Sequence, residues 1–182
     1  MKNRRDARIL ALLVLYEADT ALHPAGLVLQ RHLQEQADIN DEVRDYASGL
    51  VSGVVNHMDE LNAVLGACAP EFPVQQIAPI DRNILRIALY EIKADLAPPR
   101  VAINEAIEIS KEFGSESTPR FVNGVLGTAA ARVLDNRGPV SGSPTSGGPT
   151  SGGPADQGSG NVHAVESPAH ELNSQSENRD EK

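Results

Sequence analysis

The sequence has a single cysteine, Cys68, among its 182 residues. One thiol cannot form a disulfide within the chain, and it cannot build a cysteine-based metal site. We therefore expect a protein of a reducing compartment, the cytoplasm, with no metal and no cofactor. No stretch approaches the roughly 18–20 apolar residues that a membrane-spanning helix needs, so a membrane is not an expected partner.

Motifs of the common enzyme classes are also missing. The sequence has no glycine-rich phosphate loop of either common kind, no HExxH and no GxSxG. Carboxylates such as Glu105, Glu108 and Glu112 recur at spacings of three and four, which is typical of a solvated helix face. We therefore expect a protein that is not an enzyme.

The opening stretch, MKNRRDARILALLVLYEAD, places basic residues before an apolar run, as a secretory signal does. Here the apolar run covers only residues 9–15, and Glu17 and Asp19 follow at once. The stretch therefore favours a first helix over about 4–21 that is central in the fold.

A change of composition divides the chain into two parts. From Gly138 the pentapeptide PTSGG occurs twice, and residues 136–182 hold eight glycines, five prolines and eight serines among 47. Such a segment buries too little apolar surface to offset its chain entropy, so we expect 136–182 to be a disordered, acidic tail. Residues 1–135 are enough for one packed domain, with 13 Lys and Arg against 19 Asp and Glu, a net charge of -6.

Apolar residues of this domain recur at helical spacing, and no useful stretch alternates as a half-buried strand would. Thr118 is expected as an N-cap before Pro119, and Gly114 as a C-cap. The pattern predicts an all-α domain, a compact bundle of about seven helices. We expect these over about 4–21, 25–37, 41–57, 58–67, 79–93, 101–114 and 118–134.

The cations at the start of the chain oppose the helix dipole of the helix that they begin. Each costs about 0.3–1 kcal/mol there, and a local choice that works against the fold is expected mainly at functional sites. A phosphate bound at this end would meet side chains, free amide groups and the dipole together. The alternative is a frayed basic terminus, and the residues alone do not decide between the two. The cations are Lys2, Arg4, Arg5 and Arg8.

Three later stretches, read with the opening one, resemble the NusB family of bacterial transcription antitermination factors. They are DRNILRIALYEI (81–92), VAINEAIEISKEFG (101–114) and RFVNGVLGTAA (120–130). The resemblance implies a fold of two small subdomains, the first built from three helices. It also implies a non-catalytic function: binding boxA-type single-stranded RNA in nascent ribosomal RNA transcripts, together with the ribosomal protein NusE. The RNA polymerase elongation complex with other Nus factors would be the wider partner.

The resemblance also assigns residues. It implies RNA binding by Lys2, Arg4, Arg5, Arg8, Tyr16, Arg120, Phe121 and Asn123, and NusE binding by Asp81, Arg82 and Glu91. The alternatives are a core aromatic for Phe121 and a helix-start carboxylate for Asp81. Gly124 is expected to serve close helix packing, and Ile87 and Tyr90 to lie in the core.

Asp6 interrupts the basic cluster and lowers its charge from +4 to +3. We therefore expect weak RNA binding by the chain alone, improved by a basic partner. Two other functions stay open. One is the RNA-binding domain of ribosomal RNA cytosine methyltransferases, which needs a following methyltransferase domain where this chain has its tail. The other is a purely structural interaction module, such as a homodimer.

Overall fold

The computed structural model describes residues 2–36 and 38–135, with the side chain of Lys2 left out. This part of the chain holds seven α-helices, one 3-10 helix and no strand, which confirms the predicted all-α bundle. The predicted disordered tail, 136–182, lies outside the described residues. The elements are α1 (Lys2–Ala21), α2 (Ala25–Glu35), α3 (Asp41–Asn56), α4 (Met58–Cys68), η1 (Val74–Gln76), α5 (Pro79–Lys93), α6 (Pro99–Phe113) and α7 (Thr118–Asp135).

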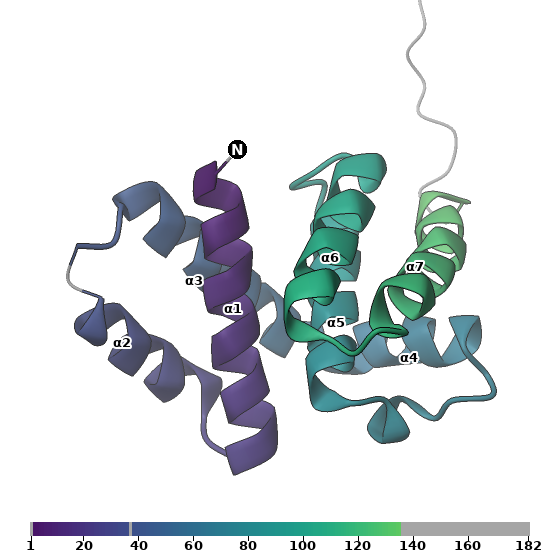
Figure 1. Ribbon diagram of the computed structural model, residues 1–182, viewed down its shortest axis with the longest axis horizontal. Coiled ribbons are helices and arrows are strands. Elements are labelled where there is room, and N and C mark those ends of the chain that lie inside the picture. The colour runs from purple at the N-terminus through teal and green to yellow at the C-terminus, as the bar shows by residue number, and fades with distance from the viewer. Residues whose placement is uncertain (1, 37, 136–182) are drawn as a thin grey trace, which may run out of the picture. The chain divides into compact units, whose positions relative to one another are not determined.

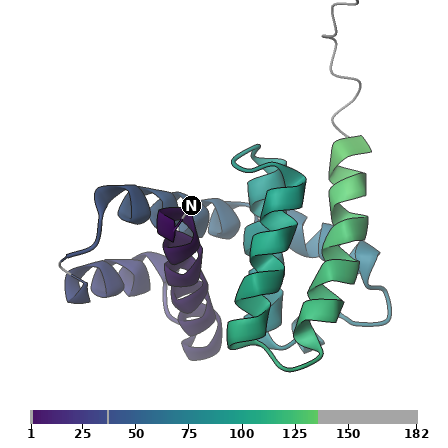
Figure 2. The ribbon, with the colours of Figure 1, turned by 45° about the horizontal axis from the view of Figure 1, so that its top comes forward.

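The helices form two groups (Figure 1). Helices α1, α2 and α3 pack on one another, as do α5, α6 and α7, and α4 packs against α5 and α7. The groups meet where α1 and α3 pack against α5. The turned view shows α1 and α6 as neighbours on the same side of the domain (Figure 2).

One hydrophobic core runs through both groups, because helices that carry a broad apolar stripe must bury it against a neighbour. Its largest fully buried side chains come from α1, α3, α4, α5 and α7. Ile87 is buried, as predicted, at 4% exposure. Tyr90 is only partly buried, and its ring covers Gly53 of α3, where an added Cβ would lie 1.9 Å from the ring.

Helix starts follow local sequence rules, with shifts of two residues at the starts of α1 and α6. The Asn40 side chain accepts a hydrogen bond from the Glu42 amide at 2.7 Å, so it caps α3. Helix α6 begins at Pro99, two residues before the predicted start at 101. Proline suits the first helical position because its missing N–H would have no partner there, so Pro99 starts the helix that we expected it to precede.

Gly114 and Thr118 join the end of α6 to the start of α7. Gly114 is the C-cap as predicted, but its φ of -92° is one that any residue adopts. What requires glycine is close approach, since an added Cβ would lie 2.6 Å from the Thr118 Cβ. The Thr118 hydroxyl does not have the predicted role of an N-cap. It accepts a hydrogen bond from the Ser115 amide at 2.9 Å and donates to the Asp81 carboxylate, whose two oxygens each lie 3.1 Å away.

Candidate nucleic-acid interface

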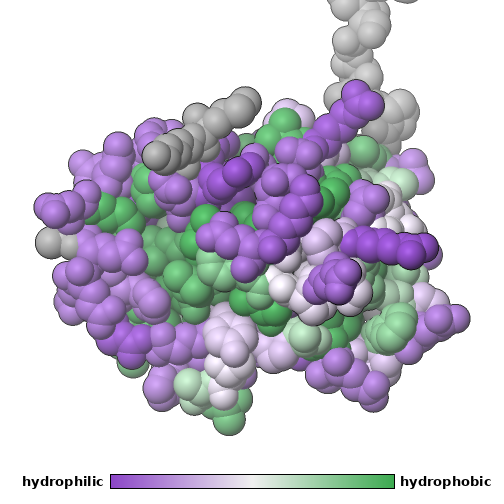
Figure 3. Space-filling model, in the orientation of Figure 1, coloured by the Kyte–Doolittle hydropathy of each residue, from purple (hydrophilic) through white to green (hydrophobic). Residues whose placement is uncertain are grey.

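Arg4, Arg5 and Arg8 project from the first two turns of α1, and we call them the basic end of α1. Hydrophilic side chains gather around this end of the helix (Figure 3). Arg4 is exposed, and its guanidinium lies 4.5 Å from the centroid of the Tyr46 ring, within cation–π range. Its Nη1 also donates to the Leu96 carbonyl oxygen at 2.9 Å. Arg4 is therefore held in place while it remains at the surface.

Arg5 forms a bidentate ion pair with Glu105 of α6. Its Nε and Nη2 each donate to one carboxylate oxygen at 2.9 Å. The Arg5 side chain keeps 42% of its surface exposed, whereas that of Glu105 keeps 15%. The hydrogen bond and the charge of Glu105 raise the pKa of Arg5, and the bond from Arg5 lowers the pKa of Glu105 against the effect of burial.

Arg8 is buried, with 4% of its side chain exposed. Its Nη2 lies 2.8 Å from Glu91 Oε1, and its Nε donates to the same carboxylate. Burial by itself would lower the pKa of Arg8, but the bonds to Glu91 and the negative charges around it raise it overall. The Tyr46 hydroxyl also donates to Glu91. Burial, and to a smaller extent this hydrogen bond, raises the pKa of Tyr46 to about 12.

Arg8 and Glu91 were expected to bind RNA and NusE, respectively. The structure places both in the interior and pairs them with each other, with Glu91 at 0% exposure. In the folded domain, neither side chain is exposed for direct contact with a partner. The sequence spacing could have predicted the burial of Arg8. It precedes the buried Leu12 and Leu15 by four and seven residues, which places it on the inward face of α1.

Arg82, the third residue expected to bind NusE, is also engaged within the domain. Its side chain is 12% exposed, and its Nη2 lies 2.8 Å from Asp19 Oδ2 at the far end of α1. Its Nη1 donates to the Gln75 carbonyl oxygen at 3.2 Å. The role that the geometry supports for Arg82 is to tie α1 and η1 to the start of α5.

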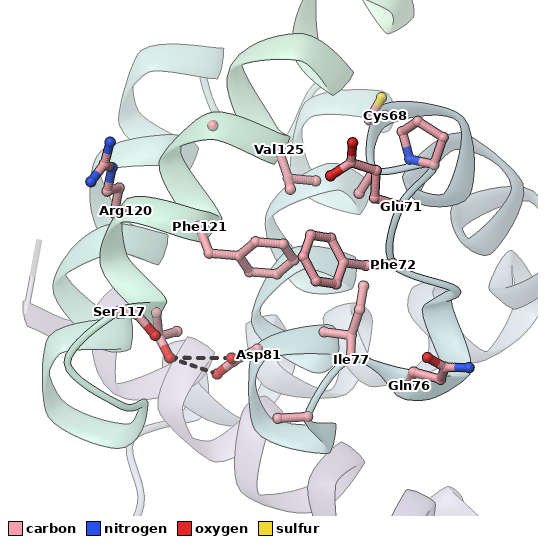
Figure 4. A pocket seen from close by; sticks show the side chains of 15 residues that line it. Cys68, Glu71, Phe72, Gln76, Ile77, Asp81, Ser117, Arg120, Phe121 and Val125 are labelled. Atoms are coloured by element: carbon pink, nitrogen blue, oxygen red, sulfur yellow. Dashed lines mark hydrogen bonds between the residues drawn. The ribbon is translucent and has the colours of Figure 1, made fainter. Parts of the chain in front are cut away.

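A groove of about 800 Å³ opens between the segment after α4, the start of α5 and the start of α7 (Figure 4). Phe72 and Phe121 meet in it edge to face, with ring centroids 6.0 Å apart and planes at 77°. Phe72 is 54% exposed, which is high for a large apolar side chain. The groove therefore offers an open aromatic surface.

Two charged residues with predicted roles, Asp81 and Arg120, line this groove together with Phe121. Burial raises the pKa of Asp81, although the hydrogen bond from Thr118 opposes the shift. Asn123 is exposed on α7, next to the groove-lining Gly124. The prediction that Gly124 serves close helix packing is wrong, because an added Cβ would meet nothing within 4 Å.

Apart from Tyr16, the predicted RNA residues that the structure describes thus lie in two places. The basic end of α1 lies beside Glu91 and Glu105, whereas Arg120 and Phe121 share the groove with Asp81. Asp81 and Glu91 are ten residues apart on α5, which corresponds to about 15 Å along the helix axis. Tyr16, on α1, is 40% exposed and belongs to neither group of contacts. An RNA that met both places would have to extend along the domain.

Within the described residues, no group of three or more His, Cys, Asp or Glu side chains could hold a metal ion. In the same part of the chain, no helix is long and apolar enough to cross a membrane. The two places together present cations, carboxylates and an aromatic groove, and these groups suit the binding of a partner.

The family model described as the NusB family matches residues 5–131, which include Arg5, Arg8, the groove and all seven helices except the first residues of α1 and the last residues of α7. The chain belongs to the NusB family. Its relative from Chloroflexus aggregans, named transcription antitermination protein NusB, is 40% identical over 137 residues, covering 74% of this chain and 91% of that protein. A protein of the same name from Dehalococcoides mccartyi strain CBDB1 is 42% identical over 134 residues, covering 73% and 93%.

A solved structure of the antitermination factors NusB and NusE in complex with double-stranded RNA is also similar to this NusB-family chain. The TM-score is 0.66 at 26% identity, and the match covers 72% of this chain and 98% of the solved one. The match therefore spans nearly the full length of the solved chain and about three quarters of this one.

Sequence reasoning missed three residues of this NusB-family domain that shape the two places. Glu105 was interpreted as part of a solvated helix face, yet it binds Arg5. Tyr46 had no predicted role, yet its hydroxyl donates to Glu91. Phe72 carried no signal at all, because it lies outside the helices in a proline-flanked segment. Only tertiary packing brings these residues to their partners.

Proposed function

We propose that this chain is a non-catalytic transcription antitermination factor of the cytoplasm. It binds boxA-type RNA in nascent ribosomal RNA transcripts together with NusE, and it supports elongation by RNA polymerase with other Nus factors. The observation that carries this proposal is membership of the NusB family, with relatives of that name at about 40% identity. The similarity to a NusB chain solved with NusE and RNA supports both partners.

The exposed charges support an RNA contact at the basic end of α1. Arg8 is buried, so Arg4 and Arg5 are the described arginines left to meet phosphates there, and the sequence adds Lys2 as a third cation. If all three cations met phosphates of a single strand, the salt slope would be at most about 3 × 0.7, or roughly 2. Such a slope is small, and the domain around it has a net charge of -6. Weak binding by the chain alone, strengthened by NusE, follows from this balance.

Arg120, Phe121 and Asn123 supply a second place for RNA, and Asp81 supplies the NusE contact. Aromatic side chains bind unstacked bases of any sequence, which suits the open face of the aromatic pair. Asp81 lies on the same groove, so the two partners would meet close to one another.

The relatives favour this function over the methyltransferase alternative. The chain spans 91% and 93% of two of them, so these proteins have no room for a further catalytic domain. The homodimer alternative is tested by gel filtration of the free chain beside the RNA titration.

The deciding experiment titrates the full chain with boxA-like single-stranded RNA, a scrambled strand and a duplex, each with and without NusE. We expect boxA-like RNA to bind more tightly than the scrambled strand, and NusE to improve its affinity at least tenfold. Equal affinity with and without NusE would contradict the shared mechanism. The duplex arm is included because the similar solved complex contains double-stranded RNA.

A further inference from the structure

Glu105 occupies the donors through which Arg5 would bind a phosphate. The two guanidinium nitrogens on one edge of Arg5 each donate to one carboxylate oxygen at 2.9 Å. A guanidinium binds carboxylate and phosphate in the same bidentate way, so the two ligands exclude each other on that edge. A phosphate that approaches Arg5 must therefore displace Glu105 or accept hydrogen bonds from the N–H groups that Glu105 leaves unused.

The surroundings of Glu105 add to this competition. Glu108 and Glu112 follow it at three and seven residues on α6, which places all three carboxylates on one helix face. The charges of Glu108 and Glu112 also reach Arg5. Glu105 lies 3.5 Å from the Arg8 Nη1 as well, so its position is fixed by two arginines of α1.

Resting on the RNA-binding function proposed above, we propose that Glu105 is an internal competitor of RNA phosphate for Arg5, and that it holds down the RNA affinity of the isolated chain. Arg5 then contributes little to RNA binding until Glu105 is displaced or neutralised. The weak binding expected of this chain is thereby set by tertiary structure more than by Asp6, which is exposed.

The size of the effect follows from the exposure of the pair. Arg5 is 42% exposed, and ion pairs at such positions are worth a factor of about 1.4 to 5 in an equilibrium constant. Removing the carboxylate should therefore tighten RNA binding about two- to five-fold at low salt. It should also raise the salt slope by about 0.7, which is one additional phosphate contact by a single strand.

The test compares Glu105→Gln with Glu108→Gln, which has the same change of charge on the same helix. Glu108 is a suitable control because its charge acts on Arg5 less than that of Glu105 and without the hydrogen bonds, whereas its carboxylate pairs with Lys111 at 2.6 Å. Affinity for boxA-like single-stranded RNA is measured for each full-length variant between 50 and about 300 mM salt, after a thermal melt has established that it folds. We expect E105Q to bind the RNA more tightly than the wild-type chain and with a larger salt slope. For E108Q we expect the RNA affinity to change by less than about 1.5-fold and the salt slope to stay the same.

A second pair of variants keeps the proposal testable. Glu105→Ala removes the acceptor that glutamine retains, and it should change affinity in the same direction as E105Q. Adding Arg5→Ala to E105Q should cancel both the gain in affinity and the additional slope. Weaker RNA binding by E105Q would overturn the proposal, because Glu105 would then be a residue that positions Arg5 for RNA. Equal gains in RNA affinity by E105Q and E108Q would also overturn it. Absence of RNA binding by the wild-type chain would instead contradict the proposed function.

Discussion

Arg8 of α1 and Glu91 of α5 form a buried ion pair, with 2.8 Å between Nη2 and Oε1 and side chains 4% and 1% exposed. The Tyr46 hydroxyl completes the site from α3, so one carboxylate joins three helices. Because removal of one partner leaves an uncompensated buried charge, the pair fixes how the two groups of helices meet.

The first prediction concerns this pair. Glu91→Gln or Arg8→Met should each lower the free energy of unfolding by about 3–5 kcal/mol, whereas the double change to Met and Leu should recover much of the loss. Denaturant unfolding measures both. The exposed Arg44–Asp41 pair is the control, and R44A should cost less than about 1 kcal/mol. A loss below 1 kcal/mol for E91Q would contradict the structural role.

The second prediction concerns two aspartates with opposite pKa shifts. Burial raises the pKa of Asp19, but the bonds and charges of Arg82 and Arg86 outweigh it and hold the pKa below its ordinary value of 3.8. Ionised Asp19 therefore contributes stability above pH 4 that is lost as pH falls through its lowered pKa. We expect Asp19→Asn to cost about 1–3 kcal/mol at pH 7 and less near pH 3.

Asp81 should behave in the opposite way, because burial raises its pKa. Its ionised form is unfavourable in the folded state, so its contribution to stability improves as pH falls through the raised pKa. Asp81→Asn should therefore be neutral or slightly stabilising at pH 7, since an amide oxygen still accepts from Thr118. Urea unfolding across pH 3–7 compares the two variants, and a loss at pH 7 as large as that of D19N would refute the distinction.

The third prediction concerns the groove. Phe121→Ala should weaken boxA-like RNA binding by about 1–3 kcal/mol if a base stacks there, and Phe72→Ala should weaken it in the same direction. Fluorescence titration of the full chain measures both. Leu134→Ala is the control, because Leu134 is similarly exposed but lies at the far end of α7. Unchanged RNA affinity in F121A with reduced NusE affinity would reassign the groove to the protein partner.

The fourth prediction compares two glycines. An added Cβ at Gly114 would lie 2.6 Å from Thr118 and 2.7 Å from the Ser110 carbonyl oxygen, so Gly114→Ala should destabilise the domain by about 1–3 kcal/mol. Gly124 has open space and lies within α7, so Gly124→Ala should stabilise it by up to about 1 kcal/mol. Thermal melts separate the two, and equal effects would count against the close approach of α6 and α7.

The helices could be predicted from the sequence because their signals are local. Apolar spacing, the Asn40 cap and the prolines at helix starts act within a few residues of each helix, so bounds agreed to within two residues for most elements. The candidate site was predicted less well. Arg120, Phe121 and Asp81 do meet at one groove, but the basic end of α1 lies elsewhere, and the partners of its arginines are 83 and 100 residues away in sequence.

The sequence by itself determined the class of the fold, the family and the list of cations, because each depends on residue type and spacing along the chain. Tertiary structure alone decided which of those cations remain available. Arg4, Arg5 and Arg8 are close together in the sequence, yet packing gives them different partners. Arg4 meets the Tyr46 ring and a backbone carbonyl, Arg5 meets the 15% exposed carboxylate of Glu105, and Arg8 meets the buried carboxylate of Glu91. The physical reason is that an ion pair depends on distance in space, and the carboxylates that neutralise these arginines reach them only when α5 and α6 pack beside α1.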